Sequence, residues 1–398
     1  MGYTNLEWLV SPHDASHFLD DMWEKKPLLI RRGTAGYYGS LLSLKDIDEV
    51  LTSPSVEFPE IRLTKLGAKL EASDYTHSGS KIDAVAVCKL YADGATVILD
   101  KMNSRIKTLR ELCQNLGREL GIRFQTNLYL TPPRSGGFDT HFDTHDVFVL
   151  QICGSKKWEL FESSFELPMP GQHHDEPGFA PAGPVTATFE LHEGDLLYIP
   201  RGVYHRAEST GELSLHITLG AHTRSWGEFL IESLGEVIAR DVSFRRGLPI
   251  GFETGRFKVS EAREQFSSLL RRFADGSDFD KVAASFADEF SRTSDIPLEG
   301  QLLRTIEFAK IDDSTVVQAR EPGNHLVSKR NETVSIHYGA SVIEFPGRME
   351  DSVSDLLSGR AIRIGDLRGN ISMEDRIEIV RRTAEAGLTR FLLAAAGM

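Results

Sequence analysis

A series of short β-rich segments extends from Phe124 to Leu219, and this series constrains the fold of the chain more than any other feature. The segments are FQTNLYL, DVFVLQI, KWELF, ATFEL, DLLYI and LSLHITL, and Gly, Pro and Asp residues separate them. Several short strands at this spacing are typical of a β-sandwich or a jelly-roll barrel. One interruption, Pro168–Pro184, is too rich in Pro and Gly to be a strand. A loop of that length in a compact domain is usually functional or mobile.

Helical patterns flank this β-rich part. TLRELCQNLGRELG carries leucines at helical spacing and ends at Gly121, which predicts a helix before the first strand. After Ser225 come three further amphipathic segments, WGEFLIESLGEVIA, SEAREQFSSLLRRF and FDKVAASFADEF. Their apolar stripes lack metal-binding residue types, so we expect them to pack as a small bundle between domains or subunits.

The C-terminal residues 311–398 predict a compact mixture of strands and helices. VSIHYGASVIEFP indicates two short strands around Gly339, and SMEDRIEIVRRTAEAG indicates a helix with Ser372 as N-cap, Asp375 three residues later and Gly387 as its stop. This mixture resembles a winged helix, a fold that often binds DNA. The segment holds 13 acidic and 11 basic side chains, a net charge of −2. DNA binding requires a basic face, so we favour a structural or protein-binding role.

Length and composition set the domain count and the compartment. A chain of 398 residues exceeds the roughly 250–300 residues at which single cores stop growing, which favours several domains, here 1–224, 225–310 and 311–398. The net charge of −13 argues against broad phosphate-backbone binding and is compatible with a basic partner. The three scattered cysteines argue against a disulfide framework and a thiolate zinc site. With no secretory signal pattern and no membrane-spanning apolar run, we expect a cytoplasmic protein.

The stretch THFDTHD, residues 140–146, contains two histidines and two aspartates. On a β-strand His141 and Asp143 point to the same side, so one strand can supply two metal ligands. GDLLYIPRGVYHRAES offers a third ligand, His205, at the start of a strand that follows a Pro-Arg-Gly turn. Two histidines and one carboxylate on one face of a metal, with open positions opposite, are typical of non-haem Fe(II) oxygenases. The sequence therefore predicts His141, Asp143 and His205 as a metal triad.

Other titratable residues near the triad have different predicted roles. His145 shares the parity of the two ligands, but it lies roughly 13 Å along the strand from His141, so we interpret it as a pocket residue. Asp146 has the opposite parity, and we expect it to fix local structure. The cluster His173-His174-Asp175 in the long loop is better explained as a solvated group than as a second metal site.

Strand alternation also predicts a polar pocket. In SKKWELF, Lys156 shares a face with Trp158 and Leu160, which turns it inward, where a buried ammonium requires an anion. FQTNLYL places polar residues on one face, and LSLHITL does the same; the residues are Gln125, Asn127 and Tyr129, and Ser214, His216 and Thr218. The alternative, that these faces meet solvent, is credible for Ser214 and Thr218.

These residues resemble a known family. TPPRSGGFDTHFDTHDVFVLQICGSKKWEL, GDLLYIPRGVYHRAES and LSLHITLG closely resemble the JmjC-type, cupin-like 2-oxoglutarate oxygenases of the ribosomal oxygenase group, as do MWEKKPLLIRRG and YADGATVILDKM. The resemblance implies an α+β chain with a double-stranded β-helix (jelly-roll) core, a helical dimerisation region and a C-terminal winged-helix-like domain. It places the Fe(II) ligands on His141, Asp143 and His205. It also places the residue that binds the distal carboxylate of 2-oxoglutarate on Lys156, with Asn127 and Tyr129 lining the cosubstrate pocket.

The resemblance implies an enzyme, an Fe(II)- and 2-oxoglutarate-dependent dioxygenase that uses O2 to hydroxylate an Arg- or His-type side chain in a protein or peptide. A homodimer and a basic substrate, with a ribosomal protein as one candidate, are the implied partners; neither a membrane nor nucleic acid is expected. The alternatives are a tailoring hydroxylase of a peptide natural product, a demethylase of N-methylated lysine, and a non-catalytic cupin-type sensor that acts through its winged helix. One departure is Gly220-Ala221, where relatives often carry hydroxyl residues.

Overall fold

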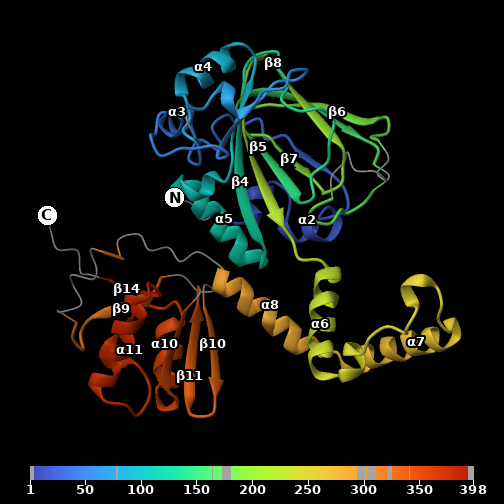
Figure 1. Cartoon of the computed structure of the whole chain (residues 1–398). Helices are drawn as coiled ribbons and strands as arrows, with labels where there is room; N and C mark the ends of the chain where they lie inside the picture. Colours follow the sequence, from blue (N-terminus) through green and yellow to red (C-terminus); the bar gives the residue numbers. More distant parts are fainter. Residues whose placement is uncertain are drawn as a thin grey trace. The chain divides into compact units, whose positions relative to one another are not determined.

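The computed structural model describes residues 4–77, 79–163, 165–172, 181–293, 301–302, 311–320, 325–339 and 341–392. The chain divides into two compact units, Met1–Thr223 and Arg224–Met398 (Figure 1). Among the described residues, no helix combines the length and the apolar character that crossing a bilayer requires.

The first unit is built on one antiparallel sheet of eight strands, in agreement with the predicted jelly-roll core. The strand order is β1-β7-β5-β8-β4-β3-β2, and β6 pairs with β5. The strands are β1 (Leu28–Ile30), β2 (Ile61–Thr64), β3 (Thr96–Leu99), β4 (Arg123–Thr131), β5 (Asp146–Phe161), β6 (Val185–Leu191), β7 (Leu196–Ile199) and β8 (His205–His222).

Strands β5 and β8 are long and pair along their whole length, from Asp146 opposite Ala221 to Leu160 opposite His205. The segments DVFVLQI and KWELF are therefore parts of one strand, and so are His205 and LSLHITL. Irregularities in the pairing lie on both sides of Gly154, which has a φ of +65° and no room for a Cβ, since one would lie 1.8 Å from the carbonyl oxygen of Leu213. A bulge of this kind changes the parity of a strand. As a result, odd-numbered residues before Gly154 and even-numbered residues after it face the same side.

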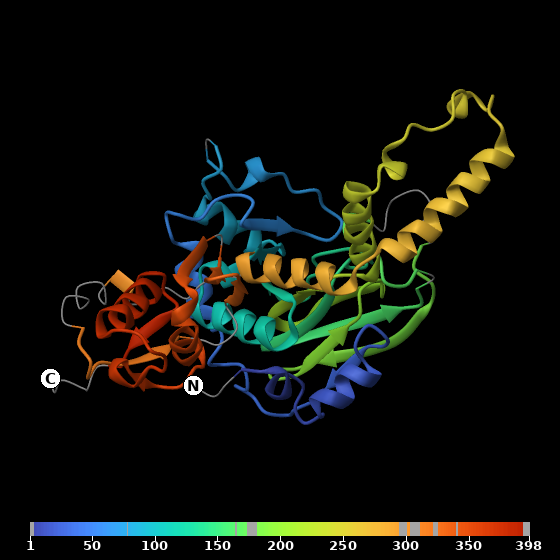
Figure 2. The same cartoon turned by 90° about the horizontal axis from the view of Figure 1, so that it is seen from below.

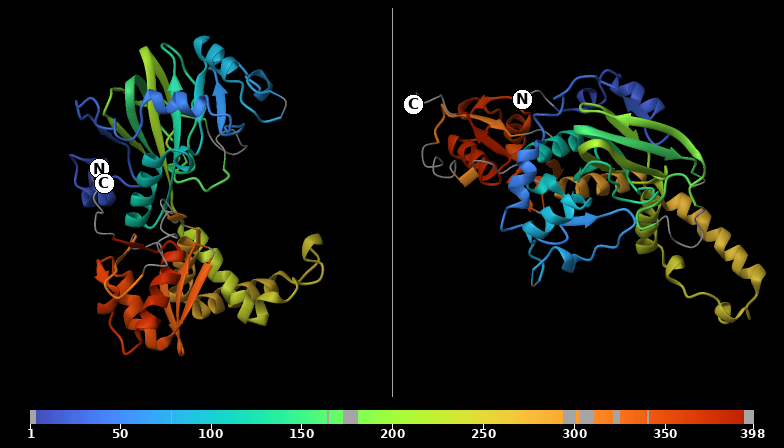
Figure 3. Two further views of the ribbon diagram at one scale, coloured as in Figure 1. Left: turned by 90° about the vertical axis from the view of Figure 1, so that its left-hand side faces the viewer. Right: turned by 90° about the horizontal axis from the view of Figure 1, so that it is seen from above.

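The helices of the first unit come from the residues before β4, and their buried side chains pack against the sheet. They are α1 (Leu6–Val10), α2 (Ala15–Asp21), α3 (Leu44–Leu51), α4 (Ala84–Ala92) and α5 (Lys107–Leu120), with the 3-10 turns η1 (Ala72–Asp74) and η2 (Met102–Ser104). The predicted helix before the first strand is α5, which packs next to β4 (Figure 3). It ends at Gly121 in the left-handed conformation. Buried leucines of α5 join residues of the sheet in the main hydrophobic core.

The first part of the second unit is helical, as predicted. Its helices are α6 (Trp226–Arg240), α7 (Val259–Gly276) and α8 (Phe279–Thr293), with the 3-10 turns η3 (Val242–Arg245) and η4 (Phe252–Thr254). Ser225 caps α6 through a capping box with Glu228. Figure 2 shows that a long loop extends away from α6 and then reverses direction at the start of α7.

The C-terminal part of the second unit contains more strands than the two that the sequence predicts. One sheet has the order β10-β11-β12 and another has the order β13-β9-β14. The elements are β9 (Val316–Ala319), β10 (Leu326–Arg330), β11 (Thr333–Tyr338), β12 (Ser341–Pro346), η6 (Gly347–Met349), α10 (Glu350–Leu357), β13 (Ile362–Arg363), η7 (Ile364–Asp366), α11 (Met373–Glu385) and β14 (Thr389–Phe391). The two strands around Gly339 are confirmed as β11 and β12, and the helix capped by Ser372 is confirmed as α11. The likeness to a winged helix stays a prediction.

Candidate functional site

The segment that carries His141 and Asp143 is not a strand, so the predicted strand for THFDTHD is wrong up to Asp146, where β5 begins. Only His141 pairs there, in an isolated antiparallel bridge with His205. Its backbone N–H donates to the His205 carbonyl at 3.1 Å and its carbonyl accepts from the His205 N–H at 2.8 Å. The Gly202 N–H donates to the Asp143 carbonyl at 3.0 Å. Since the segment is bound to the Pro200–His205 turn rather than to a full ladder, it can bend while holding both side chains beside His205.

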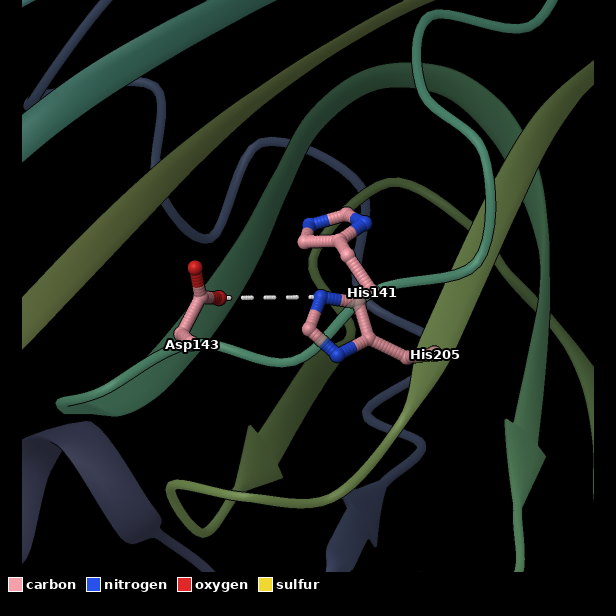
Figure 4. Close-up of side chains that lie close together, drawn as sticks. All are labelled: His141, Asp143 and His205. Carbon is pink, nitrogen blue, oxygen red and sulfur yellow. Dashed lines mark ion pairs between the residues drawn. The ribbon is translucent and has the colours of Figure 1, made fainter. Parts of the chain in front are cut away.

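The three predicted ligands lie together, as Figure 4 shows. One ligand atom from each of His141, Asp143 and His205 can be chosen so that all lie within 4.8 Å of one another. His205 Nε2 is 3.6 Å from Asp143 Oδ2, and the two imidazole rings are 4.5 Å apart between centroids. This is a compact set of two nitrogen donors and one carboxylate.

Both histidines are oriented by backbone carbonyls. His141 Nδ1 lies 2.8 Å from the Asp139 carbonyl oxygen, and His205 Nδ1 lies 3.0 Å from the Val203 carbonyl oxygen. A carbonyl only accepts, so each Nδ1 carries the proton and each Nε2 keeps its lone pair for a metal. Burial, followed by the nearby His141, lowers the pKa of His205 to about 4. The ring is therefore neutral at pH 7, which is the form that binds metals, and the donor set fits an Fe(II) ion.

A cavity extends from this triad into the barrel. Its lining contains every predicted site residue: His141, Asp143 and His205, with Asn127, Tyr129 and Lys156. Apolar side chains of β5 line it as well, namely Val147, Val149 and Trp158. The bulge at Gly154 explains how odd-numbered and even-numbered residues of one strand share this face.

Lys156 lies in the cavity with an unusual environment for an amine. The residue is only 4% exposed, and its Nζ donates to Thr131 Oγ1 at 3.2 Å. Among the described residues, no carboxylate forms an ion pair with Lys156, and burial lowers its pKa to about 7. The prediction that Lys156 turns inward is confirmed, and within the described part of the chain its ammonium has a hydroxyl partner but no anionic one.

The polar faces of β4 and β8 also meet the cavity. Tyr129, on β4, stacks on His216, on β8, with ring centroids 4.9 Å apart. Burial raises the pKa of Tyr129, so its hydroxyl stays protonated. The Asn127 side-chain oxygen accepts from Gln125 Nε2 and from the backbone N–H of Lys101, which leaves its amide group as a donor. Ser214 is buried and accepts from Gln151, and Thr218 is half-buried and lines the cavity.

His145 lines the cavity but belongs to a different cluster from the triad. Its ring stacks on His222 with centroids 4.7 Å apart and lies over Gly220, where an added Cβ would be 2.6 Å from His145 Cδ2. The departure at Gly220 therefore makes room for the imidazole of His145. Asp146, in contrast, is fully buried and accepts from Tyr198 and Arg201 at 2.8 Å each, which confirms its structural role.

Some residues of the site were missed, and one predicted cluster cannot be located. Sequence alternation gave no signal for Thr131, which accepts from Lys156, or for Thr96, which donates to Thr131, because these contacts depend on the pairing of distant strands. His216 appeared on a polar face but received no role. The cluster His173-His174-Asp175 lies outside the described residues.

Comparisons with known proteins agree with this geometry. The family profile described as JmjC domain matches residues 102–229. Ribosomal oxygenase 1 from Homo sapiens is 35% identical over 266 residues, which cover 62% of this chain and 39% of the relative. The bifunctional lysine-specific demethylase and histidyl-hydroxylase NO66 from Drosophila erecta is 30% identical over 295 residues, 67% of this chain and 42% of the relative. The chain thus spans less than half the length of these curated relatives.

Among solved structures, the ribosomal oxygenase YcfD from Escherichia coli in complex with cobalt and 2-oxoglutarate is similar in fold. The similarity has a TM-score of 0.54 at 16% sequence identity, and it covers 96% of this chain and 98% of the other. Another structure of E. coli ycfD has a TM-score of 0.53 at 17% identity, with the same coverage.

Proposed function

Because the chain carries a JmjC domain at residues 102–229, we propose that it is an Fe(II)- and 2-oxoglutarate-dependent oxygenase that hydroxylates an amino-acid side chain in a protein or peptide. One observation carries the proposal: a compact triad of two histidines and a carboxylate shares a cavity with a buried lysine that has no anionic partner among the described residues. A sensor domain that binds an unrelated ligand has no need for both features in one cavity.

The residues of the cavity divide the work. His141, Asp143 and His205 would hold Fe(II), which with 2-oxoglutarate and O2 supplies the oxidising chemistry. Lys156 would pair with the distal carboxylate of 2-oxoglutarate and so fix the cosubstrate along the cavity. Asn127 and Tyr129 present donors from β4, while Val147, Val149 and Trp158 form an apolar wall that excludes water.

The test is an anaerobic titration of the full chain with Fe(II) and then 2-oxoglutarate, followed by addition of O2 and measurement of succinate. His141→Ala should abolish Fe(II) binding, because two ligands cannot hold the ion well. Lys156→Ala should leave Fe(II) binding intact and weaken 2-oxoglutarate binding.

Matched controls are His192→Ala and Lys157→Ala, whose side chains are exposed on the same unit. Both controls should behave like the wild type. Absence of metal binding and of succinate formation by the wild-type chain would end the oxygenase proposal. Full turnover by both site variants would refute the residue assignment.

For the substrate, we propose a basic protein or peptide with an Arg- or His-type target side chain, and a ribosomal protein is the first candidate to assay. The net charge of −13 supports a basic partner. Relatives named ribosomal oxygenase and histidyl-hydroxylase support the same choice. The C-terminal part, for which we retain the winged-helix-like description, would bind protein rather than nucleic acid. Mass spectrometry distinguishes hydroxylation, which adds one oxygen atom, from loss of a methyl group.

We further propose that the helical region 225–310 forms a homodimer. The segment between α6 and α7 exposes apolar side chains, with Ile250 98% exposed and Leu248 68% exposed. Together with α7 this segment lines an apolar groove of about 400 Å³. Exposed apolar surface on this scale marks interaction sites, and a second copy of the same helical arm is an occupant with matching apolar chemistry.

Light scattering of the purified chain tests the dimer. Wild type should have twice the mass of the monomer, and Ile250→Asp should shift it toward the monomer. Val85→Asp, at an exposed apolar position of α4, serves as the control and should stay dimeric. A monomeric wild type would refute the dimer.

A further inference from the structure

At the Lys156 end of the cavity, one hydroxyl serves two donors. The Thr131 hydroxyl oxygen already accepts from Lys156 Nζ and from Thr96 Oγ1, each at 3.2 Å. His216 lines the same cavity as Lys156, and burial, followed by the charge of Lys156, lowers the pKa of His216 well below its usual value. The imidazole is therefore neutral and carries one N–H.

His216 has one buried ring nitrogen that lacks a hydrogen-bond partner within the described ranges. The residue is 2% exposed, and its Nδ1 has no hydrogen-bond partner among the described residues. Buried imidazole nitrogens are rarely left in this condition, because the unmet hydrogen bond opposes folding. A side chain that serves only for packing could be Phe at this position without that cost.

The orientation of the His216 ring is fixed by its neighbours rather than by hydrogen bonds. Tyr129 stacks on one face at an interplanar angle of 0°. Trp158 meets the ring edge-to-face, with centroids 5.7 Å apart. Both neighbours line the same cavity as His216 and Lys156. The ring is thus held in place, with an unsatisfied nitrogen, in the cavity that Lys156 also lines.

We propose that His216 is a second positioning residue for the cosubstrate, whose imidazole N–H donates to the same distal carboxylate that Lys156 binds. The inference rests on the proposed function. A carboxylate has two oxygens and about four acceptor sites, so it can accept from Lys156 and His216 together. Binding of the dicarboxylate then gives the Lys156 ammonium an anionic partner and the unsatisfied His216 ring a hydrogen-bond acceptor.

Comparing two metal chelators on the full-length chain loaded with Mn(II) tests this role by calorimetry. 2-Oxoglutarate contains the distal carboxylate, whereas oxalate chelates the metal without one. His216→Phe keeps the stacking on Tyr129 but removes the N–H. Loss of one hydrogen bond to a charged group should raise the Kd of 2-oxoglutarate by roughly 10- to 100-fold. The Kd values of oxalate and of Mn(II) should stay at the wild-type level.

His216→Gln retains an N–H donor and should recover part of the affinity for 2-oxoglutarate. Wild-type affinity in His216→Phe, or an equal loss of affinity for both chelators, would overturn the inference. If the Phe variant does not fold, His216→Leu replaces it as the variant without an N–H, and His216→Asn serves as the variant that keeps one. The Leu variant must then lose affinity for 2-oxoglutarate but not for oxalate. Failure of the proposed function has a different signature: the metal-loaded wild type itself would bind neither chelator.

Discussion

Replacing Lys156 with Met should make the unliganded protein more stable while removing its response to 2-oxoglutarate. Burial lowers the pKa of Lys156 from 10.5 to about 7, whereas the amine keeps its ordinary pKa in the unfolded chain. At pH 7 the amine is fully protonated in the unfolded chain, and folding buries this charged form at a cost in free energy. At 1.36 kcal/mol for each pKa unit, this lowers the free energy of unfolding by about 4 kcal/mol. Met has a similar length and no charge, so the substitution removes this penalty.

The sign of the pH dependence follows from the lowered pKa. Below about pH 7 the penalty is complete, because the unfolded chain binds the proton more tightly than the folded chain does. As the pH rises toward 10.5, the unfolded amine also loses its proton, and the penalty disappears. The advantage of Lys156→Met should therefore be largest at pH 7 and below, and shrink toward pH 10.

Thermal unfolding of the full chain, followed by circular dichroism at several pH values, measures this effect. For a unit of this size, about 4 kcal/mol corresponds to a rise in Tm of roughly 10 °C. Lys157→Met is the matched control, because the neighbouring Lys157 is half exposed and pairs with Glu159. Adding 2-oxoglutarate to the Mn(II)-loaded protein should raise the Tm of the wild type further but not that of Lys156→Met. An unchanged or lower Tm for Lys156→Met at pH 7, or a gain that does not vary with pH, would refute the reasoning.

Two further predictions concern glycines of the barrel. Gly154→Ala should destabilise the fold by about 3 kcal/mol or more and impair 2-oxoglutarate binding, because the bulge turns Lys156 into the cavity. Gly211→Ala, which has open space around it, should be nearly silent in chemical denaturation, and equal losses in both variants would contradict this account. Gly220→Ala should displace His145 and cost about 1–3 kcal/mol, while the same substitution in a His145→Ala background should cost much less. Additive losses in that double-mutant cycle would show that the two positions are not coupled.

The sequence predicts the fold where local signals and burial agree. The helix that ends at Gly121, the three helices after Ser225 and the helix after Ser372 are all confirmed. Each has an apolar stripe, and Gly121, Ser225 and Ser372 mark an end of three of them. Alternation also identified Lys156 as inward-facing, since its own face carries Trp158 and Leu160. What alternation could not predict is the bulge at Gly154, because the constraint there comes from the Leu213 carbonyl on a different strand.

For the candidate site, the residue types were easier to predict than the backbone that holds them. His141 and Asp143 share a side, but in a bent segment that pairs through a single bridge rather than in a strand. The close approach of His145 to Gly220 could not be predicted either, since the two residues are 75 positions apart in the sequence and are brought together by the pairing of β5 with β8. Contacts of this kind are tertiary, and no periodicity within one segment records them.

The hydrogen bonds that orient His141 and His205 have a consequence for how the protein tolerates change. Each ring donates to the carbonyl of the residue two positions before it, Asp139 in one case and Val203 in the other. Main-chain acceptors persist whatever side chain is attached, so substitutions at 139 and 203 that keep the local backbone should leave metal affinity intact. The orientation of both ligands therefore depends on the backbone conformation, and it should be kept when many side chains around the triad are substituted.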